Sequence, residues 1–364
     1  MTLRLPLRCL ESSFYAGLLD DPVLLLKVRP LGRSLLIDCG RIHHLAKRVL
    51  KNLDAVFISH AHMDHFMGLD TLIRHVHGSN RTLELFGPPG ITRRIENKLQ
   101  GYDWNLAEPS WCRFRVFEIF PDRVVRSLFA GSEGFRRQFL DEARRTDRRI
   151  YRNRYLTVEA ELLDHRIPVL AFRITENPSF APDEEKIAKA GLLKGPWLET
   201  LKRAFHEESL SQNRLLVPMR GTASTTEYVL RDAEPLYECI RAENRPASIG
   251  YVTDVGMNRN NLRIIRSFLQ DLTLLVSECS FLSEGRDKAR GSWHLCTDDL
   301  NRLLRILRPE FVLPMHLSKT YINCSDQLYR QLVLPEGTSL LKLPDHVAPR
   351  PLLPCEVCRL TGFR

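Results

Sequence analysis

Three histidines and one aspartate lie within six consecutive positions of this chain, at His60, His62, Asp64 and His65. They directly follow the apolar run at residues 55–58, which predicts a strand that ends at this point. Side chains in a loop at the end of a strand can converge on one point, and imidazole together with carboxylate suits zinc and its first-row neighbours. A lone His-x-His would be typical of a solvated turn, but this denser pattern predicts a metal site.

Three later apolar runs each lead to a further candidate ligand. Alternating apolar positions at residues 158–163 predict a half-buried strand that ends beside His165. Two more runs predict strands that end at Asp254 and at His316. An ionisable residue at a strand end is usually an ordinary polar group when it is taken alone, so the case for these three depends on their order along the chain.

The pattern His-x-His-x-Asp-His resembles the signature of the metallo-β-lactamase superfamily, and the order of all seven candidates matches that family. The resemblance implies an α/β fold, a four-layer αβ/βα sandwich with inserted segments. It also implies two divalent metal ions, zinc first, with manganese or iron as alternatives. One ion would be held by His60, His62 and His165, the other by Asp64, His65 and His316, with Asp254 bridging them.

The sequence around His165 narrows the resemblance. Residues 163–174 are similar to the stretch that carries the third-motif histidine of ribonuclease Z, the transfer-RNA 3′-processing endonuclease. Glu278 would match the glutamate of that family's His-Glu-Ala-Thr motif, and His294 the histidine of its His-Ser-Thr motif. Shorter similarities lie at residues 36–40, 86–90 and 190–198, the last of which resembles a Gly-Pro segment. The resemblance covers residues 34–102, 156–203 and 248–321.

Several positions depart from the ribonuclease Z motifs without removing a metal ligand. Ser277 and Cys279 flank Glu278 where the family has histidine and alanine, and Leu295 stands where it has serine. The family's Gly-Asp-Thr reads Thr-Asp-Val at residues 253–255, and its His-x-Ser-x-Arg-Tyr reads His-Leu-Ser-Lys-Thr-Tyr at residues 316–321. These positions would grip phosphate or substrate, and by the same resemblance Ser318 and Lys319 would contact the substrate.

The implied chemistry is hydrolysis of a phosphodiester. Two ions about 3.5–4 Å apart can lower the pKa of a shared water to near 7, and the resulting metal-bridged hydroxide would attack phosphorus in line. The leaving 3′ oxygen then needs a proton, for which His294, oriented by Glu278, is the candidate general acid. Asp64 would also orient the nucleophile.

Three functions fit these residues. The first is a ribonuclease Z-like endonuclease that cleaves structured RNA at the 3′ end of transfer-RNA precursors, and the resemblance also implies a homodimer as one option. The second is a hydrolase of the same fold that acts on a small phosphodiester, lactone or thioester. The third is a non-catalytic RNA-binding module with a structural metal, although a structural site needs no open coordination position.

Composition and segment pattern bound these options. The chain has 364 residues, 43% of them hydrophobic, enough for one large domain over residues 1–364. Two stretches look inserted, a basic one at residues 103–155 and an irregular, arm-like one at residues 176–232. From residue 233 helices and strands alternate, which is typical of an α/β sandwich.

The chain shows no membrane or secretory pattern. No apolar stretch approaches the ~20 residues of a membrane span, and no apolar core of a signal peptide is apparent. The nine cysteines are scattered, which predicts a reducing, cytoplasmic location without a disulfide framework. Cys355 and Cys358 form a lone Cys-x-x-Cys. We interpret them as surface thiols, with a metal-binding knuckle as the alternative.

The positive charge is concentrated in one segment. The formal net charge is +9, and eight arginines lie within residues 136–154. A partial apolar stripe in this segment predicts a helix with a cationic outer face. We interpret Arg144, Arg145, Arg148 and Arg149 as a clamp for the phosphate backbone of structured RNA, with a solvated helix face as the alternative.

Overall fold

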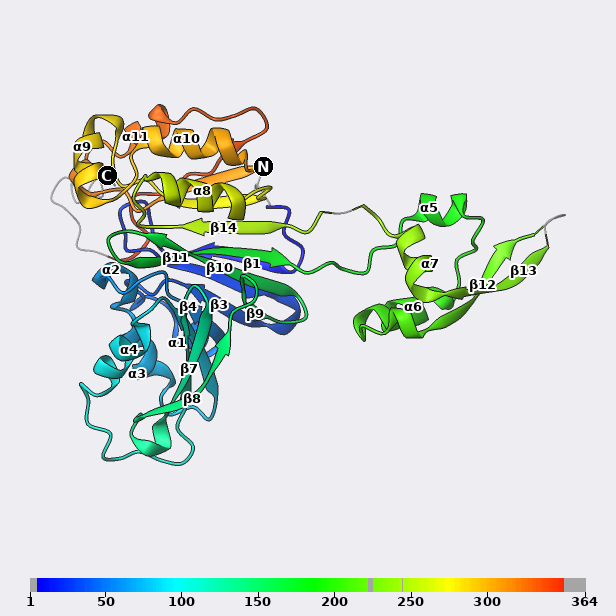
Figure 1. Ribbon diagram of the computed structural model, residues 1–364, viewed down its shortest axis with the longest axis horizontal. Coiled ribbons are helices and arrows are strands. Elements are labelled where there is room, and N and C mark those ends of the chain that lie inside the picture. Colours follow the sequence, from blue (N-terminus) through cyan, green and yellow to red (C-terminus); the bar gives the residue numbers. More distant parts are fainter. Residues whose placement is uncertain (1–4, 222–224, 244, 350–364) are drawn as a thin grey trace, which may run out of the picture. The chain divides into compact units, whose positions relative to one another are not determined.

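The computed structural model describes residues 5–221, 225–243 and 245–349 (Figure 1). Cys355 and Cys358, on which the sequence raised a metal-knuckle alternative, lie outside these residues. The chain forms two compact units, where one domain with insertions was expected. Unit 1 comprises Met1–Glu176 and Ala247–Arg364, and unit 2 comprises Asn177–Pro246.

The first sheet of unit 1 has eight strands in the order in which they occur in the sequence. They are β1 (Leu10–Phe14), β2 (Leu24–Val28), β3 (Arg33–Ile37), β4 (Leu53–Phe57), β5 (Thr82–Gly87), β6 (Arg113–Ile119), β7 (Arg123–Ala130) and β8 (Arg137–Arg144). The four central strands, β3 to β6, run parallel. Their carboxyl ends therefore meet at one edge of the sheet, as expected for strands that present ligands.

The second sheet has seven strands in the order β17-β16-β15-β14-β11-β10-β9. Their bounds are β9 (Arg149–Arg152), β10 (Leu156–Asp164), β11 (Pro168–Glu176), β14 (Ser248–Val252), β15 (Leu274–Glu278), β16 (Phe311–Met315) and β17 (Ser339–Leu340). The strands β14 to β17 are parallel, and β9 to β11 pair antiparallel. The strands predicted beside His165, Asp254 and His316 are thus neighbours or near neighbours in one sheet.

Helices cover the outer faces of both sheets (Figure 1). The helices α1 (Lys47–Lys51), α3 (Leu69–Val76) and α4 (Ile91–Leu99) pack on the first sheet, and α8 (Arg259–Phe268), α10 (Thr297–Leu307) and α11 (Asp326–Gln331) on the second. Each set of helices forms an apolar layer with its sheet, and a third apolar layer lies between the two sheets and includes Phe57, Phe172 and Tyr251. Unit 1 is therefore the predicted four-layer αβ/βα sandwich.

Unit 2 has its own small core. It contains α5 (Glu184–Lys189), α6 (Trp197–His206), the antiparallel ribbon β12 (Arg214–Arg220) and β13 (Thr226–Asp232), and α7 (Ala233–Ile240). Trp197, Leu201, Val217 and Ile240 are buried between the helices and one face of the ribbon. The unit extends past residue 232, the end expected from the sequence, because α7 supplies part of this core.

The helix predicted across the arginine-rich segment is wrong. Residues 137–144 form β8 and residues 149–152 form β9, with a short loop between them. The reason is strand pairing: β8 pairs with the preceding strand β7 and β9 with the following strand β10, and Arg126 binds Asp141 across the ladder at 2.5 and 2.7 Å. Pairing with these neighbouring strands overrides a short apolar stripe at helical spacing. The segment expected as an insertion at residues 103–155 thus contributes strands to both sheets.

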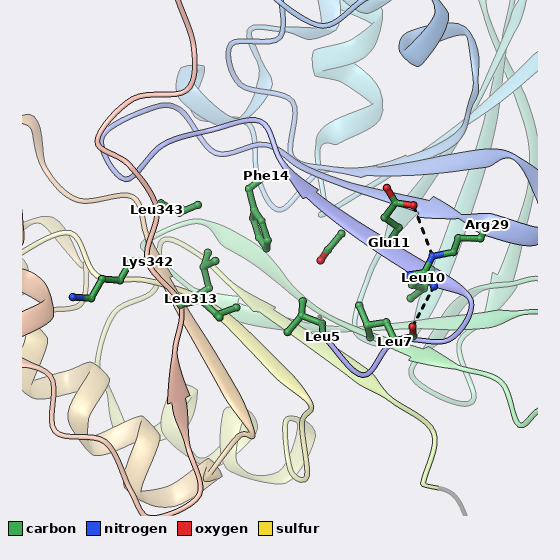
Figure 2. Close-up of a pocket in the computed structure, with 11 residues that line it drawn as sticks. Leu5, Leu7, Leu10, Glu11, Phe14, Arg29, Leu313, Lys342 and Leu343 are labelled. Carbon is green, nitrogen blue, oxygen red and sulfur yellow. Dashed lines mark hydrogen bonds and ion pairs between the residues drawn. The ribbon is translucent and has the colours of Figure 1, made fainter. Parts of the chain in front are cut away.

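A cavity of ≈ 850 Å³ lies at the edge of unit 1 beside β1 (Figure 2). Its walls combine apolar side chains such as Leu7, Phe14 and Leu313 with polar ones, and Arg29 pairs with Glu11 beside it at 3.7 Å. None of the candidate metal ligands lines it. Among the described residues, no helix is long and apolar enough to cross a membrane.

Candidate metal centre

The candidate ligands lie where strands end and the backbone turns sharply. His60 follows β4, Asp254 follows β14, and His316 follows β16 directly. Asp254 has a φ of 38° and His316 a φ of 61°, in the left-handed region that non-glycine residues rarely adopt. Such backbone strain persists only where the surroundings enforce it and is common at functional sites. It aims both side chains across the edge of the sheet.

Close packing of the backbone also shapes this edge. A Cβ atom on Gly40 would lie 2.2 Å from the carbonyl oxygen of Asp64 and 2.7 Å from the side chain of Asp21. Position 40 therefore has no room for a side chain. The loop after β3 can approach the ligand segment only because this residue is glycine.

Asp254 lies between two groups of imidazoles. Its Oδ2 atom is 3.4 Å from His60 Nε2 and 3.9 Å from His165 Nε2. The same oxygen is 3.9 Å from His62 Nδ1. Its Oδ1 atom is 3.4 Å from His65 Nε2 and 3.3 Å from His316 Nδ1. One carboxylate therefore faces each group with a different oxygen, as a bridging ligand would.

The structure brings all seven sequence-predicted ligands together. In each of two groups the ligand atoms lie within 4.8 Å of one another, and a third group of the same kind adds Glu278 and His294. The first group is His60, His62, His165 and Asp254; the second is Asp64, His65 and His316; the third is Asp254, Glu278, His294 and His316. In the second group Asp64 Oδ2 lies 3.0 Å from His316 Nε2.

The site is closed on the protein side and open on the other. The side chains of His60, His65 and Asp254 are at most 2% exposed, whereas those of His62 and Asp64 are 47% and 41% exposed. A divalent ion held here would keep a face toward solvent. Catalytic metal sites keep such an open position, and structural sites do not.

The donor atoms fit divalent metal ions. His60 Nε2 and His65 Nε2 are buried and make no hydrogen bond within the part of the chain that the structure describes. A buried polar atom without a partner is destabilising by roughly 1–3 kcal/mol, and a cation between the imidazoles and Asp254 would satisfy both atoms. Imidazole and carboxylate are also ligand types that first-row divalent metals prefer.

The electrostatics of the ligands agree with this fit. Burial lowers the pKa of His60 and of His165, which favours the neutral imidazole that a metal requires. Burial alone would raise the pKa of Asp254, but His316 and His65 outweigh it and hold this pKa well below its usual range. Burial would lower the pKa of His65, yet the charges of Asp254 and Asp38 raise it well above the ordinary value. The cluster thus attracts positive charge.

Glu278 and His294 form a second pair beside Asp254. His294 Nδ1 lies 3.0 Å from Glu278 Oε2 and 3.9 Å from Asp254 Oδ1. Burial alone would lower the pKa of His294, but Glu278 outweighs it through its charge and this hydrogen bond, and the pKa rises to about 9. The carboxylate of Glu278 is itself fully buried and accepts from the backbone N–H of Val255 at 2.6 Å. An imidazole held in this way carries a proton at neutral pH.

The residues predicted to contact the substrate differ in whether their side chains already bind another group of the protein. Ser318 binds Thr320 at 2.5 Å, and Lys319 is largely exposed, 3.9 Å from Asp21. Arg148 pairs with Glu161 at 2.5 Å and Arg149 with Asp147 at 3.1 Å. The remaining two arginines of the expected clamp, Arg144 and Arg145, also differ. Arg145 donates to the carbonyls of Phe120, beside the first sheet, and of Ala160, in the second, whereas Arg144 is exposed and has no side-chain partner in the described ranges.

Sequence reasoning missed the residues that hold the ligands in place. Asp38, after β3, accepts from His65 Nδ1 at 2.8 Å, and Ser59 Oγ lies 3.0 Å from His60 Nδ1. His165 Nδ1 donates to the carbonyl of Trp293 at 2.7 Å. Asp38 could have been predicted from the sequence, because it directly follows the apolar strand that pairs in parallel with β4. The contact with the carbonyl of Trp293 could not have been predicted, since every residue type has a backbone carbonyl.

Comparison with known proteins agrees with this geometry. Residues 33–181 match a family model described as a beta-lactamase superfamily domain. A curated ribonuclease Z from Deinococcus radiodurans is 27% identical over 79% of this chain and 83% of its own length. Among solved structures, the metallo-beta-lactamase fold protein YhfI from Bacillus subtilis aligns with a TM-score of 0.52, at 14% identity over 91% of this chain and 96% of the other.

The human short-form tRNase Z is a second solved structure with the same fold. It aligns with a TM-score of 0.50, at 14% identity over 91% of this chain and 96% of its own. At such identity the two structures establish the fold alone. Residues 33–181 match the beta-lactamase superfamily domain, and the chain is similar to ribonuclease Z over 79% of its length.

Proposed function

We propose that this chain is a metal-dependent phosphodiesterase of the ribonuclease Z type, which cleaves transfer-RNA precursors at their 3′ end. The observation that carries the proposal is the pair of ligand groups on either side of Asp254, together with His294, which is hydrogen-bonded to Glu278 beside them. The similarity to ribonuclease Z over four-fifths of the chain supports the RNA substrate.

The ligand groups would hold two ions, for which zinc is the first candidate. His60, His62 and His165 would bind one and Asp64, His65 and His316 the other, with Asp254 between them. Bound ions would supply an activated water near neutral pH and offset charge on the phosphoryl oxygens. Asp64 is half exposed, so its carboxylate is also placed to orient an attacking water from the solvent side.

His294 would protonate the leaving 3′ oxygen. Its Nδ1 is engaged by Glu278, so the other ring nitrogen, Nε2, is the atom left to donate a proton. Glu278 holds the imidazole in this orientation and stabilises its charge. A proton donor whose pKa lies above neutral is loaded at physiological pH, as this step needs.

Two features favour a large anionic substrate over a small one. The formal net charge of +9 favours association with nucleic acid through counterion release. In unit 2, one face of the β12–β13 ribbon exposes Leu216, Tyr228 and Leu230 at 58%, 65% and 49%. Exposed apolar and aromatic side chains of this kind suit stacking against unpaired bases. The cysteines within the described ranges are free thiols, which fits the cytoplasmic setting of such a substrate.

The direct test compares two substrates with one preparation. The zinc-loaded protein is incubated with a 3′-extended transfer-RNA precursor and with bis-p-nitrophenyl phosphate. The proposal expects endonucleolytic cleavage of the precursor at the 3′ end of the mature sequence. Turnover of the small ester without RNA cleavage would favour a small-molecule hydrolase instead, and turnover of neither would remove the hydrolase assignment.

An Asp64→Ala variant controls for contaminating nuclease. Asp64 is 41% exposed and lies outside the apolar layers, so the variant should keep the fold and its circular dichroism spectrum. It loses one ligand of the second group and should lose both activities. Residual RNA cleavage at the wild-type rate would mean that another enzyme is responsible.

A further inference from the structure

Tyr251 joins the two sheets at a point directly behind the metal ligands. It lies on β14 of the second sheet, and its ring is fully buried in the apolar layer between the sheets. Its hydroxyl donates to Asp38 Oδ2 at 2.7 Å. Asp38 follows β3 of the first sheet and is also fully buried. The contact spans 213 positions of the sequence and involves no metal ligand itself.

The carboxylate of Asp38 is surrounded by donors. The backbone N–H of Ser59 donates to Oδ1 at 2.7 Å, and the hydroxyl of Ser59 donates to Oδ2 at 2.9 Å. His65 Nδ1 reaches Oδ2 at 2.8 Å. Tyr251 is thus the donor that comes from the opposite sheet, while the others belong to the ligand segment. A buried carboxylate needs such charge-assisted hydrogen bonds, and losing one changes where it points.

This carboxylate sets the orientation of one imidazole in each ligand group. Because Asp38 accepts from Nδ1, the nitrogen of His65 that faces Asp254 is Nε2, 3.4 Å away, and Nε2 is the atom that a metal ion would bind. Because Ser59 gives its only hydroxyl proton to Asp38, it accepts from His60 Nδ1 at 3.0 Å. His60 then also presents Nε2 to Asp254. Groups that hydrogen-bond to the far nitrogen of a ligating histidine fix its tautomer and ring orientation in metal sites.

We propose that Tyr251 is a positioning residue of the metal centre, which acts through Asp38 to aim His65 and His60 at divalent ions. The inference rests on the metal centre of the proposed function and adds a residue to it. The link to His65 is direct, whereas the link to His60 passes through Ser59. Loss of the Tyr251 hydroxyl should therefore weaken the group of Asp64, His65 and His316 more than the group of His60, His62 and His165.

The test is zinc affinity of a Tyr251→Phe variant, measured by competition with a chromophoric chelator. The substitution removes one oxygen and keeps the ring, whose packing against Phe172 has a centroid distance of 6.4 Å. Loss of a group that hydrogen-bonds to a metal ligand typically weakens metal binding about 10–100-fold. We expect a loss in this range for one of the two binding steps, a smaller loss for the other, and altered d–d bands after cobalt substitution.

The matched control is Tyr329→Phe. The hydroxyl of Tyr329 donates to the carbonyl of Leu343 at 3.1 Å and accepts from its N–H at 3.0 Å, in the same unit and without a hydrogen bond to a candidate ligand among the described residues. This variant should bind zinc as the wild type does. If both variants lose affinity alike, or if Tyr251→Phe keeps wild-type affinity, the inference is overturned.

A double-mutant cycle tests the route of the effect. If Tyr251 acts through Asp38, the Tyr251→Phe substitution should add nothing to Asp38→Asn, whereas independent action would make the losses multiply. Should the phenylalanine variant not fold, p-fluorophenylalanine at position 251 fills the volume of the hydroxyl without donating and replaces it in the same titration. Failure of the wild-type chain to bind zinc would instead overturn the metal centre, which separates that outcome from a failure of Tyr251.

Discussion

At the scale of single residues, the centre depends on carboxylates that serve two partners each. Asp254 faces one imidazole group with Oδ2 and the other with Oδ1. Glu278 holds His294 and also accepts from Ser280 Oγ at 2.7 Å, which in turn lies 3.2 Å from His316 Nδ1. A carboxylate with a serine beside it therefore orients two imidazoles here, as Asp38 and Ser59 do on the other sheet.

The role of His294 predicts a dependence on the leaving group. His294→Ala should lower cleavage of RNA, whose 3′ oxygen is a poor leaving group, by about 10²–10⁴-fold, the usual contribution of a general acid. Turnover of bis-p-nitrophenyl phosphate should fall far less, because p-nitrophenolate departs without a proton. The measurement is kcat for both substrates at saturating zinc. Equal losses on both would remove His294 from this role.

At the scale of elements, the parts that were predictable from sequence are those with local signals. Each candidate ligand follows an apolar run of strand length, so the position of His60, Asp254 or His316 at a sheet edge could be read from the chain. The helix predicted for the arginine-rich segment was wrong because a short apolar stripe does not distinguish a helix from strands that pair with their neighbours in sequence. The contact of Tyr251 with Asp38 could not be predicted because it joins residues 213 positions apart.

Two adjacent arginines at the end of β8, Arg144 and Arg145, should separate an effect on stability from an effect on RNA binding. Arg145 donates to the carbonyls of Phe120, beside the first sheet, and of Ala160, in the second, so Arg145→Gln should destabilise unit 1 by ~1–3 kcal/mol. Arg144 is exposed, so Arg144→Gln should leave stability unchanged. If Arg144 contacts RNA, the slope of log affinity against log salt should flatten by up to ~0.9 per lost phosphate contact.

Urea unfolding and RNA binding at several salt concentrations measure the two effects. Each variant is the control for the other, since both remove one positive charge at neighbouring positions. An Arg144→Gln variant with an unchanged salt slope would assign this arginine to the solvated surface.

Asp20 should make the docking of residues 344–348 depend on pH. It accepts from the N–H groups of Val347 and Ala348 at 2.6 and 2.9 Å and from His346 at 2.8 Å. Burial alone would raise the pKa of Asp20, but the hydrogen bonds from His346 and these amides lower it below its ordinary value. The stabilisation is therefore complete above the unfolded-state pKa of about 3.9 and is lost as the pH falls through the lower folded-state pKa.

The difference in unfolding free energy between wild type and Asp20→Asn isolates this group from other carboxylates. It should be constant from neutral pH to about pH 5 and then shrink toward pH 3, since the unfolded-state pKa lies between them. The protection factors of the Val347 and Ala348 amides, which compare their exchange with that of an unstructured chain at the same pH, should fall over the same interval in the wild type. A difference that does not change with pH would mean that Asp20 does not couple its charge to this segment.

At the scale of the whole molecule, the candidate metal ligands and the candidate general acid lie in one of the two units, and the other unit contains none of these residues. All seven candidate ligands, Glu278 and His294 lie in unit 1, although unit 2 interrupts its sequence. Unit 2 instead exposes apolar and aromatic side chains on a two-stranded ribbon. This division predicts that substrate size decides whether unit 2 matters.

Removal of unit 2 is feasible because its two ends leave unit 1 at one point. The N–H of Glu176 donates to the carbonyl of Ala247 at 2.9 Å, and Thr175 pairs with Ser248 in the antiparallel ladder of β11 and β14. An Asn-Gly turn can therefore replace residues 177–246 and join these strands as a hairpin. Unit 1 should fold in this variant, since its three apolar layers contain no residue of unit 2.

The shortened chain should keep its zinc and its turnover of bis-p-nitrophenyl phosphate, because the ligands and His294 are untouched. Cleavage of the transfer-RNA precursor should fall by at least about 10-fold in kcat/KM, the effect of ~1.4 kcal/mol of lost binding. Tyr228→Ala tests the same face in the intact chain, where Tyr228 is 65% exposed and its loss should not affect folding. If the shortened chain cleaves the precursor at the wild-type rate, unit 2 takes no part in holding the RNA, and the contacts must lie on unit 1.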